Sequence, residues 1–457
     1  ALAWFKGDVG AVGPLASLAT DSSTDPLERG GATRLGAGGA IAVRTTGVQT
    51  YNDVIALAAD ATLTSLTAGD VTFSELVGTD ADGRALTVNT AGVTWLKPGT
   101  TSVAGTRLGS ISTDAPGSTR FGAGGASDTS NVTTVGDQTY LDAVRLAGAV
   151  ILTSASDGGV TLGSTVDADS AANPRTLEVR TGGDTSFLGD VGVAERLAGL
   201  ITDADGAVGE RTLLGSGPGT IEVRTGASGQ SYADAVVIVS DAVLSAGSGG
   251  GVTFGSTVDS GDFGARSLTV NASGQTWFRG NVGATTALNA LTTDAPSAAL
   301  SDLGGTTRIG DAAPVTVTTV TTVATQTYND AVRLDAATTL IALGDVTFAS
   351  TVDSFNGTFR SLVVNTPGVT RFGDGGADLV GAASALSSLT TDAPGSTSIN
   401  IVAAAPQASI ITDGSQTFAD AVTLEADSIL VSFSGGDIAF LSTLDSGTAA
   451  ARSLTVN

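Results

Sequence analysis

The sequence predicts an all-β fold, a right-handed parallel β-helix (β-solenoid) in which short strands stack coil upon coil. Three observations predict it: a five-fold tandem repeat of about ninety residues, short segments of alternating apolar and polar residues between turns, and the absence of any helical periodicity. Aromatic residues make up 5% of the chain and Gly numbers 62. This composition suits thin stacked layers, in which each repeat buries its ends against its neighbours.

The repeat is carried by the signature Gln-Thr-Tyr-x-Asp, with Ser231 and Phe418 as variants. It starts 89, 92, 96 and 90 residues apart, at Gln49, Gln138, Gln230, Gln326 and Gln416. A second signature, typically Arg-x-Leu-Thr-Val-Asn, closes each unit. Cutting after it gives five repeats that we expect to form one continuous solenoid and to belong to a longer array: 1–89, 90–180, 181–271, 272–365 and 366–457.

The strands are expected to be three to six residues long, separated by Gly, Asp, Asn and Ser. In 268–271 the pattern directs Leu268 and Val270 to one side and Thr269 and Asn271 to the other. Coils of about twenty residues are usual for solenoids, so each repeat should make four or five coils and rise roughly 20 Å.

The alternative fold is a string of immunoglobulin-like β-sandwich domains, because about ninety residues also fit that class. Separate domains would need linkers, and the repeat boundaries contain no Pro-rich or charged stretch. The small, β-branched residues that dominate the sequence also favour flat stacked ladders, so the solenoid is preferred.

Composition excludes several functions. The net charge is −24, and the only lysines are Lys6 and Lys97, so nucleic acid and anionic membrane surfaces would be repelled. No run of about 18 apolar residues is present for membrane insertion. His and Cys are absent, which removes the usual acid–base groups, nucleophiles and transition-metal ligands. We therefore expect no enzyme, no catalytic residue and no cofactor.

The acids and arginines that recur once per unit are interpreted as structural, because an active site breaks a repeat whereas these groups follow it. The acids are Asp53, Asp142, Asp234, Asp330 and Asp420. The arginines are expected at the surface or at corners, paired with nearby Asp: Arg84, Arg175, Arg266, Arg360 and Arg452. A lattice contact between molecules is the alternative role for the arginines.

The aromatic residues of the repeat are expected to pack in the core or cap a corner, with a carbohydrate-stacking surface as the alternative. They are Tyr51, Tyr140, Tyr232, Tyr328 and Phe418, with Trp4, Trp95 and Trp277. Two Asp-Ala-Asp-Gly segments, carrying Asp80, Asp82, Asp203 and Asp205, fit either an Asx turn or a Ca²⁺ loop. The turn is preferred because a Ca²⁺ loop needs a further carboxylate.

The runs 326–334 and 344–353, together with Leu-Thr-Val-Asn, resemble the giant repeat-rich exoproteins of Gram-negative bacteria. This group is similar to filamentous-haemagglutinin-like and autotransporter-passenger β-helix adhesins. The resemblance implies secretion to the bacterial cell surface and an adhesive or structural role. The expected function is a passive structural rod, either the stalk of an adhesin or the body of an extracellular filament or sheath. Its expected partners are further copies of the repeat, through head-to-tail or lateral assembly, and a glycan or cell-surface ligand. A carbohydrate-binding or polysaccharide-degrading surface is the alternative function.

Overall fold

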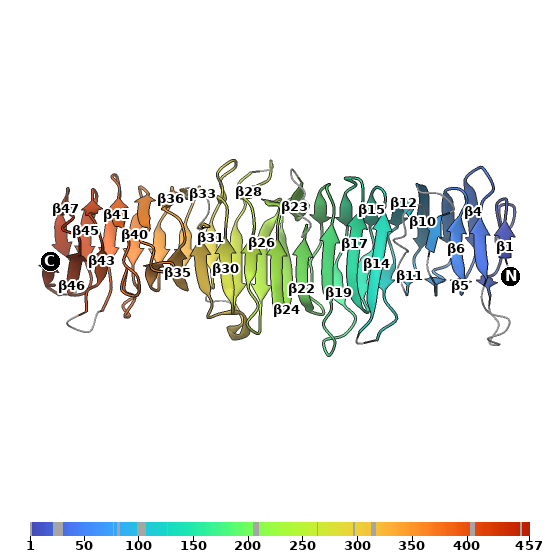
Figure 1. Cartoon of the computed structure of the whole chain (residues 1–457), viewed down its shortest axis with the longest axis horizontal. Coiled ribbons are helices and arrows are strands. Elements are labelled where there is room, and N and C mark those ends of the chain that lie inside the picture. The colour runs from blue at the N-terminus through green and yellow to red at the C-terminus, as the bar shows by residue number, and fades with distance from the viewer. Residues whose placement is uncertain are drawn as a thin grey trace. The chain divides into compact units, whose positions relative to one another are not determined.

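The computed structural model describes residues 2–21, 31–75, 77–79, 83–97, 107–125, 127–203, 210–262, 264–295, 298–311, 317–402, 407–447 and 450–457. The described residues form strands β1 to β49 and one 3₁₀ turn, Leu300–Asp302, with no α-helix (Figure 1). Neighbouring strands pair in parallel. Parallel stacking shows a β-solenoid and rules out the immunoglobulin-like alternative, whose strands are antiparallel. No helix among these residues is long and apolar enough to cross a membrane.

The chain forms two compact units, and the division between them falls within β24 (Thr220–Tyr232). Each unit is a β-solenoid, and the expectation of one continuous solenoid stays a prediction. The right-handed sense of winding also stays a prediction, based on strand twist.

Unit 1 contains long parallel ladders of hydrogen-bonded strands. Ladder C1 is β2 (Leu18–Thr20), β5 (Gln49–Tyr51), β8 (Val71–Phe73), β11 (Val93–Leu96), β13 (Ser118–Phe121), β16 (Ala143–Leu146) and β19 (Val166–Ala168). Ladder B1 is β4 (Ile41–Thr45), β7 (Ala61–Ser65), β10 (Arg84–Thr90), β12 (Leu108–Thr113), β15 (Gln138–Tyr140), β18 (Val160–Leu162), β21 (Thr185–Phe187) and β23 (Arg211–Leu214). The remaining runs are β1 (Leu2–Phe5), β3 (Ala32–Leu35), β6 (Val54–Leu57) and β9 (Val77–Thr79), and β14 (Thr129–Thr134), β17 (Ala149–Ser154), β20 (Thr176–Arg180) and β22 (Leu197–Thr202).

Unit 2 repeats this arrangement. Ladder C2 is β26 (Asp241–Ala246), β29 (Leu268–Ala272) and β31 (Leu291–Thr293), continued by β34 (Gln326–Tyr328), β37 (Val346–Phe348), β40 (Val369–Phe372), β42 (Ser396–Ile399), β45 (Ala421–Leu424) and β48 (Leu444–Ser446). Ladder B2 is β33 (Thr318–Thr322), β36 (Thr338–Ala342), β39 (Ser361–Asn365), β41 (Ser388–Thr391), β44 (Gln416–Phe418) and β47 (Ile438–Phe440). The other runs are β27 (Val252–Phe254), β30 (Gln275–Phe278), β32 (Thr306–Ile309), β35 (Ala331–Leu334) and β38 (Val352–Ser354), then β43 (Ile410–Thr412), β46 (Ser428–Ser432) and β49 (Leu454–Val456), and β25 (Ala235–Ile238) with β28 (Val258–Ser260).

Each coil has three sides. In unit 2, β34 pairs with β37, β35 with β38 and β36 with β39, so one turn of the chain contributes three consecutive strands. Along ladder C2 the register runs from Tyr328 through Phe348, Phe372 and Ile399 to Leu424, in steps of 20, 24, 27 and 25 residues. Three of these four steps are longer than the twenty residues expected from the sequence.

The ninety-residue repeat is out of phase with the three-sided coil. From β34, which carries Gln326, to β44, which carries Gln416, there are eleven strand steps: the ten strands β35 to β44 and the isolated bridge at Val380. Eleven strands over three sides make 3⅔ coils, which corrects the predicted four or five. Consecutive copies of the signature consequently lie on different ladders, Gln49 on C1 and Gln138 on B1, then Gln326 on C2 and Gln416 on B2.

The core is filled by alternate residues of each strand. In β37, Val346 and Phe348 are buried, while Thr347 between them is half-exposed. Aromatic rings stack from coil to coil in ladder C2, with centroids 5.3 Å apart for Tyr328–Phe348 and 5.4 Å for Phe348–Phe372. Parallel pairing in register places chemically similar residues on top of one another, which is why rings of the same kind meet.

A repeated Val-Gly corner requires glycine. Gly283 follows the bridging Val282, has a φ of +66°, and a Cβ built there would meet the carbonyl oxygen of Thr321 in the next coil. The same conformation and the same contact with a backbone oxygen recur at Gly10, Gly192 and Gly381.

Replacing Gly283 by Ala is expected to lower the free energy of unfolding by about 2 to 4 kcal/mol, because left-handed strain adds to a clash with rigid backbone. Gly357→Ala is the matched control. Its φ is +68°, yet nothing lies within 4 Å of the added Cβ, so only the strain of about 1 kcal/mol should appear. Urea denaturation followed by circular dichroism measures both, and equal losses would contradict the proposed clash.

Candidate functional site

The Gln-Thr-Tyr signature forms a hydrogen-bonded unit inside the core. Gln326 and Tyr328 are fully buried on consecutive inward positions of β34. The Gln326 Nε2 donates to the carbonyl oxygens of Ile341 at 2.9 Å and Val320 at 3.1 Å, and the Tyr328 hydroxyl donates to Gln326 Oε1 at 3.1 Å. The same tyrosine–glutamine bond joins Tyr51 to Gln49 and Tyr140 to Gln138. The buried amide therefore links three strands and has its oxygen satisfied by the ring hydroxyl.

The fifth copy of this unit lacks the hydroxyl. Phe418 stands where the other repeats have Tyr, and Gln416 Oε1 is buried without a hydrogen-bond partner. Burying an unpaired carbonyl oxygen costs free energy that a suitably placed donor would recover.

We expect Phe418→Tyr to raise the free energy of unfolding by about 1 kcal/mol, and Tyr328→Phe to lower it by about 1 to 3 kcal/mol. The two variants exchange the same atom in opposite directions in equivalent strands. Urea midpoints measured side by side test the pair, and a loss of stability in Phe418→Tyr would show that the fifth copy has no space for the hydroxyl.

The acid of the signature is also buried, and it is held by two threonines from earlier strands. Asp330 is 7% exposed and accepts hydrogen bonds from Thr293 Oγ1 at 2.7 Å and Thr307 Oγ1 at 2.8 Å. The same arrangement joins Thr20 and Thr33 to Asp53, Thr113 and Thr119 to Asp142, Thr202 and Thr212 to Asp234, and Thr391 and Thr397 to Asp420. We call these five groups the Thr–Asp–Thr clusters.

Burial changes the protonation of the clusters. Loss of hydration raises the pKa of Asp142 and of Asp330 to about 6, even though the threonine hydroxyls favour the charged form. Burial also raises the pKa of Asp420 and of Asp234. The neighbouring Tyr140 and Tyr328 have pKa values raised by their own burial, so they stay protonated and keep donating to Gln138 and Gln326.

A second set of acids follows the threonine that ends a strand, and each of these acids hydrogen-bonds to a backbone N–H in another coil: Asp114, Asp203, Asp294 and Asp392. Asp392 Oδ1 accepts the backbone N–H of Thr366 at 2.8 Å, and Asp114 and Asp294 accept those of Thr90 and Ala272. Asp203, one of the Ca²⁺ candidates, accepts the N–H of Thr181 at 2.9 Å in the same way. The other candidates, Asp80, Asp82 and Asp205, lie outside the described residues. Among the described residues no group of three acidic side chains could hold a metal ion.

The repeated arginines lie at the start of a strand or one or two residues before it, and they are half-exposed in four of five cases. The backbone N–H groups of Arg266, Arg360 and Arg452 donate to Ser260, Ser354 and Ser446. Arg175 differs, because it is 4% exposed, donates to the Gly125 carbonyl at 3.0 Å and lies 3.6 Å from Asp169. Pairing with an acid is thus seen at Arg175 and stays a prediction for Arg84, Arg266, Arg360 and Arg452.

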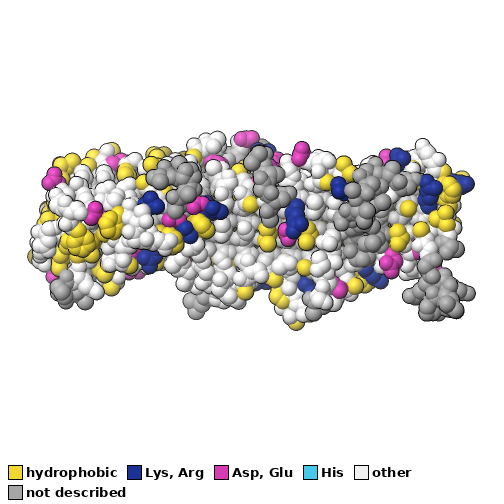
Figure 2. All heavy atoms as spheres, in the orientation of Figure 1, with side chains coloured by type: hydrophobic (Ala, Val, Ile, Leu, Met, Phe, Trp, Pro, Cys, Tyr) yellow, Lys and Arg dark blue, Asp and Glu magenta, His cyan; other side chains and the backbone are white. Residues whose placement is uncertain are grey.

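The outward side of ladder C1 carries a row of four in-register residues, Trp95, Arg120, Arg145 and Asp167. The Arg120 guanidinium lies 4.6 Å from the centroid of the Trp95 ring, and Lys97 Nζ lies 4.4 Å from it. Unit 2 has the matching row Trp277, Arg308, Arg333 and Asp353 on β30, β32, β35 and β38. On the face seen in Figure 2, basic and acidic side chains lie next to one another in several places.

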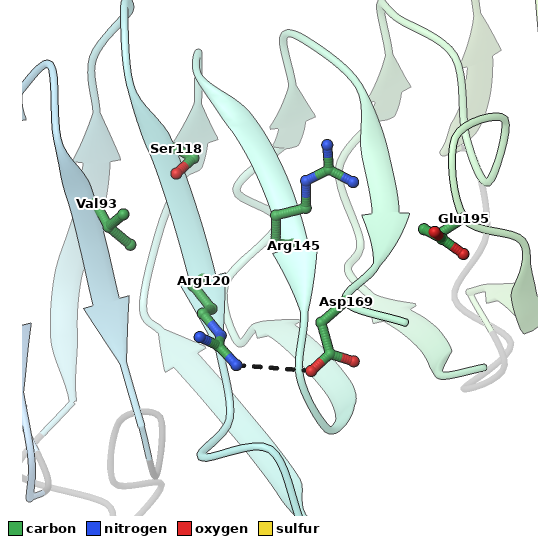
Figure 3. Close-up of a pocket in the computed structure, with 6 residues that line it drawn as sticks. All are labelled: Val93, Ser118, Arg120, Arg145, Asp169 and Glu195. Carbon is green, nitrogen blue, oxygen red and sulfur yellow. Dashed lines mark ion pairs between the residues drawn. The ribbon is translucent and has the colours of Figure 1, made fainter. Parts of the chain in front are cut away.

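A depression with a volume of about 410 Å³ lies over the row of unit 1, lined by Val93, Ser118, Arg120, Arg145, Asp169 and Glu195 (Figure 3). Arg120 pairs with Asp169 at 3.6 Å, and Arg145 pairs with Asp167 at 3.3 Å. Trp95 stands out in the sequence, but its contact with Arg120 follows only from a parallel register that pairs residues 25 positions apart. The depression is therefore a site that sequence reasoning missed.

The chain matches no protein-family model, no curated protein and no solved structure. The class that the geometry defines is a β-solenoid, whose coils fit a β-helix fold of the adhesin kind.

Proposed function

We propose that the chain is a structural segment of a large secreted protein of the bacterial cell surface, the stalk of an adhesin or the body of an extracellular filament or sheath. The observation that carries the proposal is that the residues kept from repeat to repeat point inward. The buried glutamines, tyrosines and acids of the signature hold coils together through the bonds described above.

The outward positions, in contrast, are kept in some repeats and changed in others. The residue that precedes the inward-pointing Phe5, Leu96, Phe187, Phe278 and Phe372 is Trp in three repeats and Ser or Arg in the other two: Trp4, Trp95, Ser186, Trp277 and Arg371. An array of binding sites would keep its outward residues, because these contact the ligand. A spacer needs only its interior to be kept.

The phase of the repeat supports the same conclusion. Consecutive repeats place equivalent residues on different ladders, so a group repeated on the outside would point in different directions. One-sided platforms, such as flat ligand-binding faces, need their repeated residues on one side. A spacer has no such requirement.

Adding or removing whole repeats would change the length of the solenoid. Eleven strands make 3⅔ coils, and with about 4.8 Å between stacked strands one repeat contributes roughly 18 Å. When a whole repeat is removed, the end of one repeat is joined to the start of another, and the chain already contains an equivalent junction between other repeats. Further copies of the repeat are therefore the natural partners at the end of a coil stack.

The experiment is a series of parent proteins that lack residues 272–365 or carry one or two extra copies of them, with lengths measured by electron microscopy. We expect folded proteins whose length changes by about 18 Å per repeat, with attachment or assembly retained in each. A variant of intact fold that loses all attachment or assembly when residues 272–365 are removed would overturn the spacer role.

A further inference from the structure

The first and the last strands of the described chain are each paired on one side. β1 and β2 pair with β3 and β5, and β47, β48 and β49 pair with β44, β45 and β46. Inward residues of the last strands are uncovered, since Phe440 is half-exposed and Val456 is 47% exposed. The matching residues of repeat 4, Phe348 and Val364, are 1% and 0% exposed. These outer strands therefore present apolar side chains and backbone groups that a further coil would cover.

The internal repeat junctions show which strand fits on β47. At all four junctions, the Val-Thr-Phe or Val-Thr-Leu strand pairs in one register with the first strand of the next repeat: Phe73 with Leu96, Leu162 with Phe187, Phe254 with Phe278 and Phe348 with Phe372. β47 has Phe440 at this position, and β1, the first strand of repeat 1, has Phe5. The junction register places Phe5 on Phe440, which already stacks on Phe418 with ring centroids 5.2 Å apart.

The same comparison assigns a partner to β49. The leucine of the strand that closes each repeat pairs with an apolar residue of the next: Leu86 with Ile111, Leu177 with Leu200, Leu268 with Leu291 and Leu362 with Leu389. The equivalent residues are Leu454 in β49 and Leu18 in β2 of repeat 1. Both are half-exposed, whereas Leu389 is fully buried. The junction register places β2 on β49.

An acid in β48 extends the match to the third side of the coil. At three internal junctions an Asp accepts two successive backbone N–H groups that follow the Val-Gly corner of the next repeat: Asp167 from Ala194 and Glu195, Asp259 from Thr285 and Thr286, and Asp353 from Ala383 and Ser384. Asp445 occupies the same place in β48 and is exposed. The corresponding residues after the corner at Gly10 are Val12 and Gly13, also exposed. One register thus satisfies all three sides.

We propose that β47, β48 and β49 of one copy of this chain dock onto the N-terminal strands of a second copy, head to tail and in the register of the internal junctions. Docking covers Phe440 with Phe5 and Leu454 with Leu18, and it gives Asp445 the N–H groups of Val12 and Gly13. The occupant is a second copy because the two surfaces match each other in side-chain size, strand register and hydrogen bonding. A head-to-tail contact leaves one free end on each copy, so further copies can add.

This proposal rests on the proposed function, which names copies of the repeat as partners, and specifies how a separate copy binds. Its failure is distinguishable from a failure of the spacer role. A chain that does not dock would leave the length change per repeat, measured in the series that varies residues 272–365, unaffected.

The test blocks one end at a time and measures masses by analytical ultracentrifugation. Val456→Lys places a charge in the docking surface of the last strands, and Phe5→Lys places one in that of the first strands. The unchanged chain should form species at whole multiples of its own mass as its concentration rises. Each variant alone should associate at least ten-fold more weakly. An equimolar mixture of the two should form dimers and nothing larger, because only one intact junction can form.

Two further variants separate docking from folding. Asp445→Asn changes an exposed side chain and should weaken association of the otherwise unchanged chain at least ten-fold. Asp262→Asn, at an exposed position in the turn after β28, should leave association unchanged. Circular dichroism checks that every variant keeps its β-structure. A chain that stays monomeric at about 100 µM, association that survives in either single-end variant, a mixture without dimers, or equal effects of the two Asp variants would each overturn the proposal.

Discussion

The free energy of unfolding is expected to rise as the pH falls from 7 to 5. The folded-state pKa values of Asp142 and Asp330 are about 6, above their value of 3.8 in the unfolded chain. Between these pH values the folded chain binds more protons than the unfolded one, so stability increases on acidification. Each of the two acids should contribute about 1 kcal/mol between pH 7 and 5, and about 3 kcal/mol in total below pH 3.8. Asp420 and Asp234 add in the same direction.

Urea midpoints at constant ionic strength measure this effect. The matched control is the double variant Asp142→Asn and Asp330→Asn, which keeps the shape of the clusters but cannot titrate. Between pH 7 and 5, the free energy of unfolding of this variant should change by about 2 kcal/mol less than that of the parent chain. Reduced repulsion at a net charge of −24 affects both proteins alike, so the difference isolates the clusters. A parent chain that loses stability from pH 7 to 5 would contradict the raised pKa values.

Replacing Phe348 by Ala is expected to cost about 3 to 5 kcal/mol. Phe348 is 1% exposed and is the middle ring of the stack with Tyr328 and Phe372. Truncation leaves a cavity between two rings that the backbone ladder holds apart, so little collapse can compensate. The stacking of two ring pairs is lost as well.

The control for Phe348→Ala is its outward neighbour, Thr347→Ala. Thr347 lies on the same strand, paired in register with Thr327 and Arg371, and is half-exposed. Its removal should change stability by no more than about 0.5 kcal/mol. Similar losses at the two positions would show that the inward and outward sides of β37 are wrongly assigned.

The strands could be predicted because the alternation of apolar and polar residues indicates which side of each strand is buried. Leu268 and Val270 point inward as expected, and Thr269 is half-exposed. Asn271, on the same side as Thr269 in the alternation, is only 4% exposed, because its Oδ1 accepts the N–H of Ala295 at 2.9 Å and a turn covers it. A side chain at a strand end can fold under the next turn, and alternation alone carries no information about that turn.

The number of coils per repeat could not be predicted for a related reason. The bridge at Val380 fills one of the eleven strand positions, yet its surroundings lack the alternating pattern of a strand. When such a strand position is not recognised in the sequence, the strands of one repeat are counted too low and seem to make a whole number of coils. The Thr–Asp–Thr clusters were also out of reach, because Asp330 meets Thr293 and Thr307 across 37 and 23 residues and threonine is common throughout. Only the register between successive coils shows that Thr293 and Thr307, among the many threonines, lie next to Asp330.

Hydrogen–deuterium exchange, resolved to individual strands, tests the central claim that the repeated residues form the interior and carry no specialised copy. Four of the five strands that carry the signature are β5, β15, β34 and β44. The account predicts strong and similar protection of their amides, since each is paired on both sides and anchored by its buried glutamine. Rapid exchange in one of these strands, with the others protected, would contradict it.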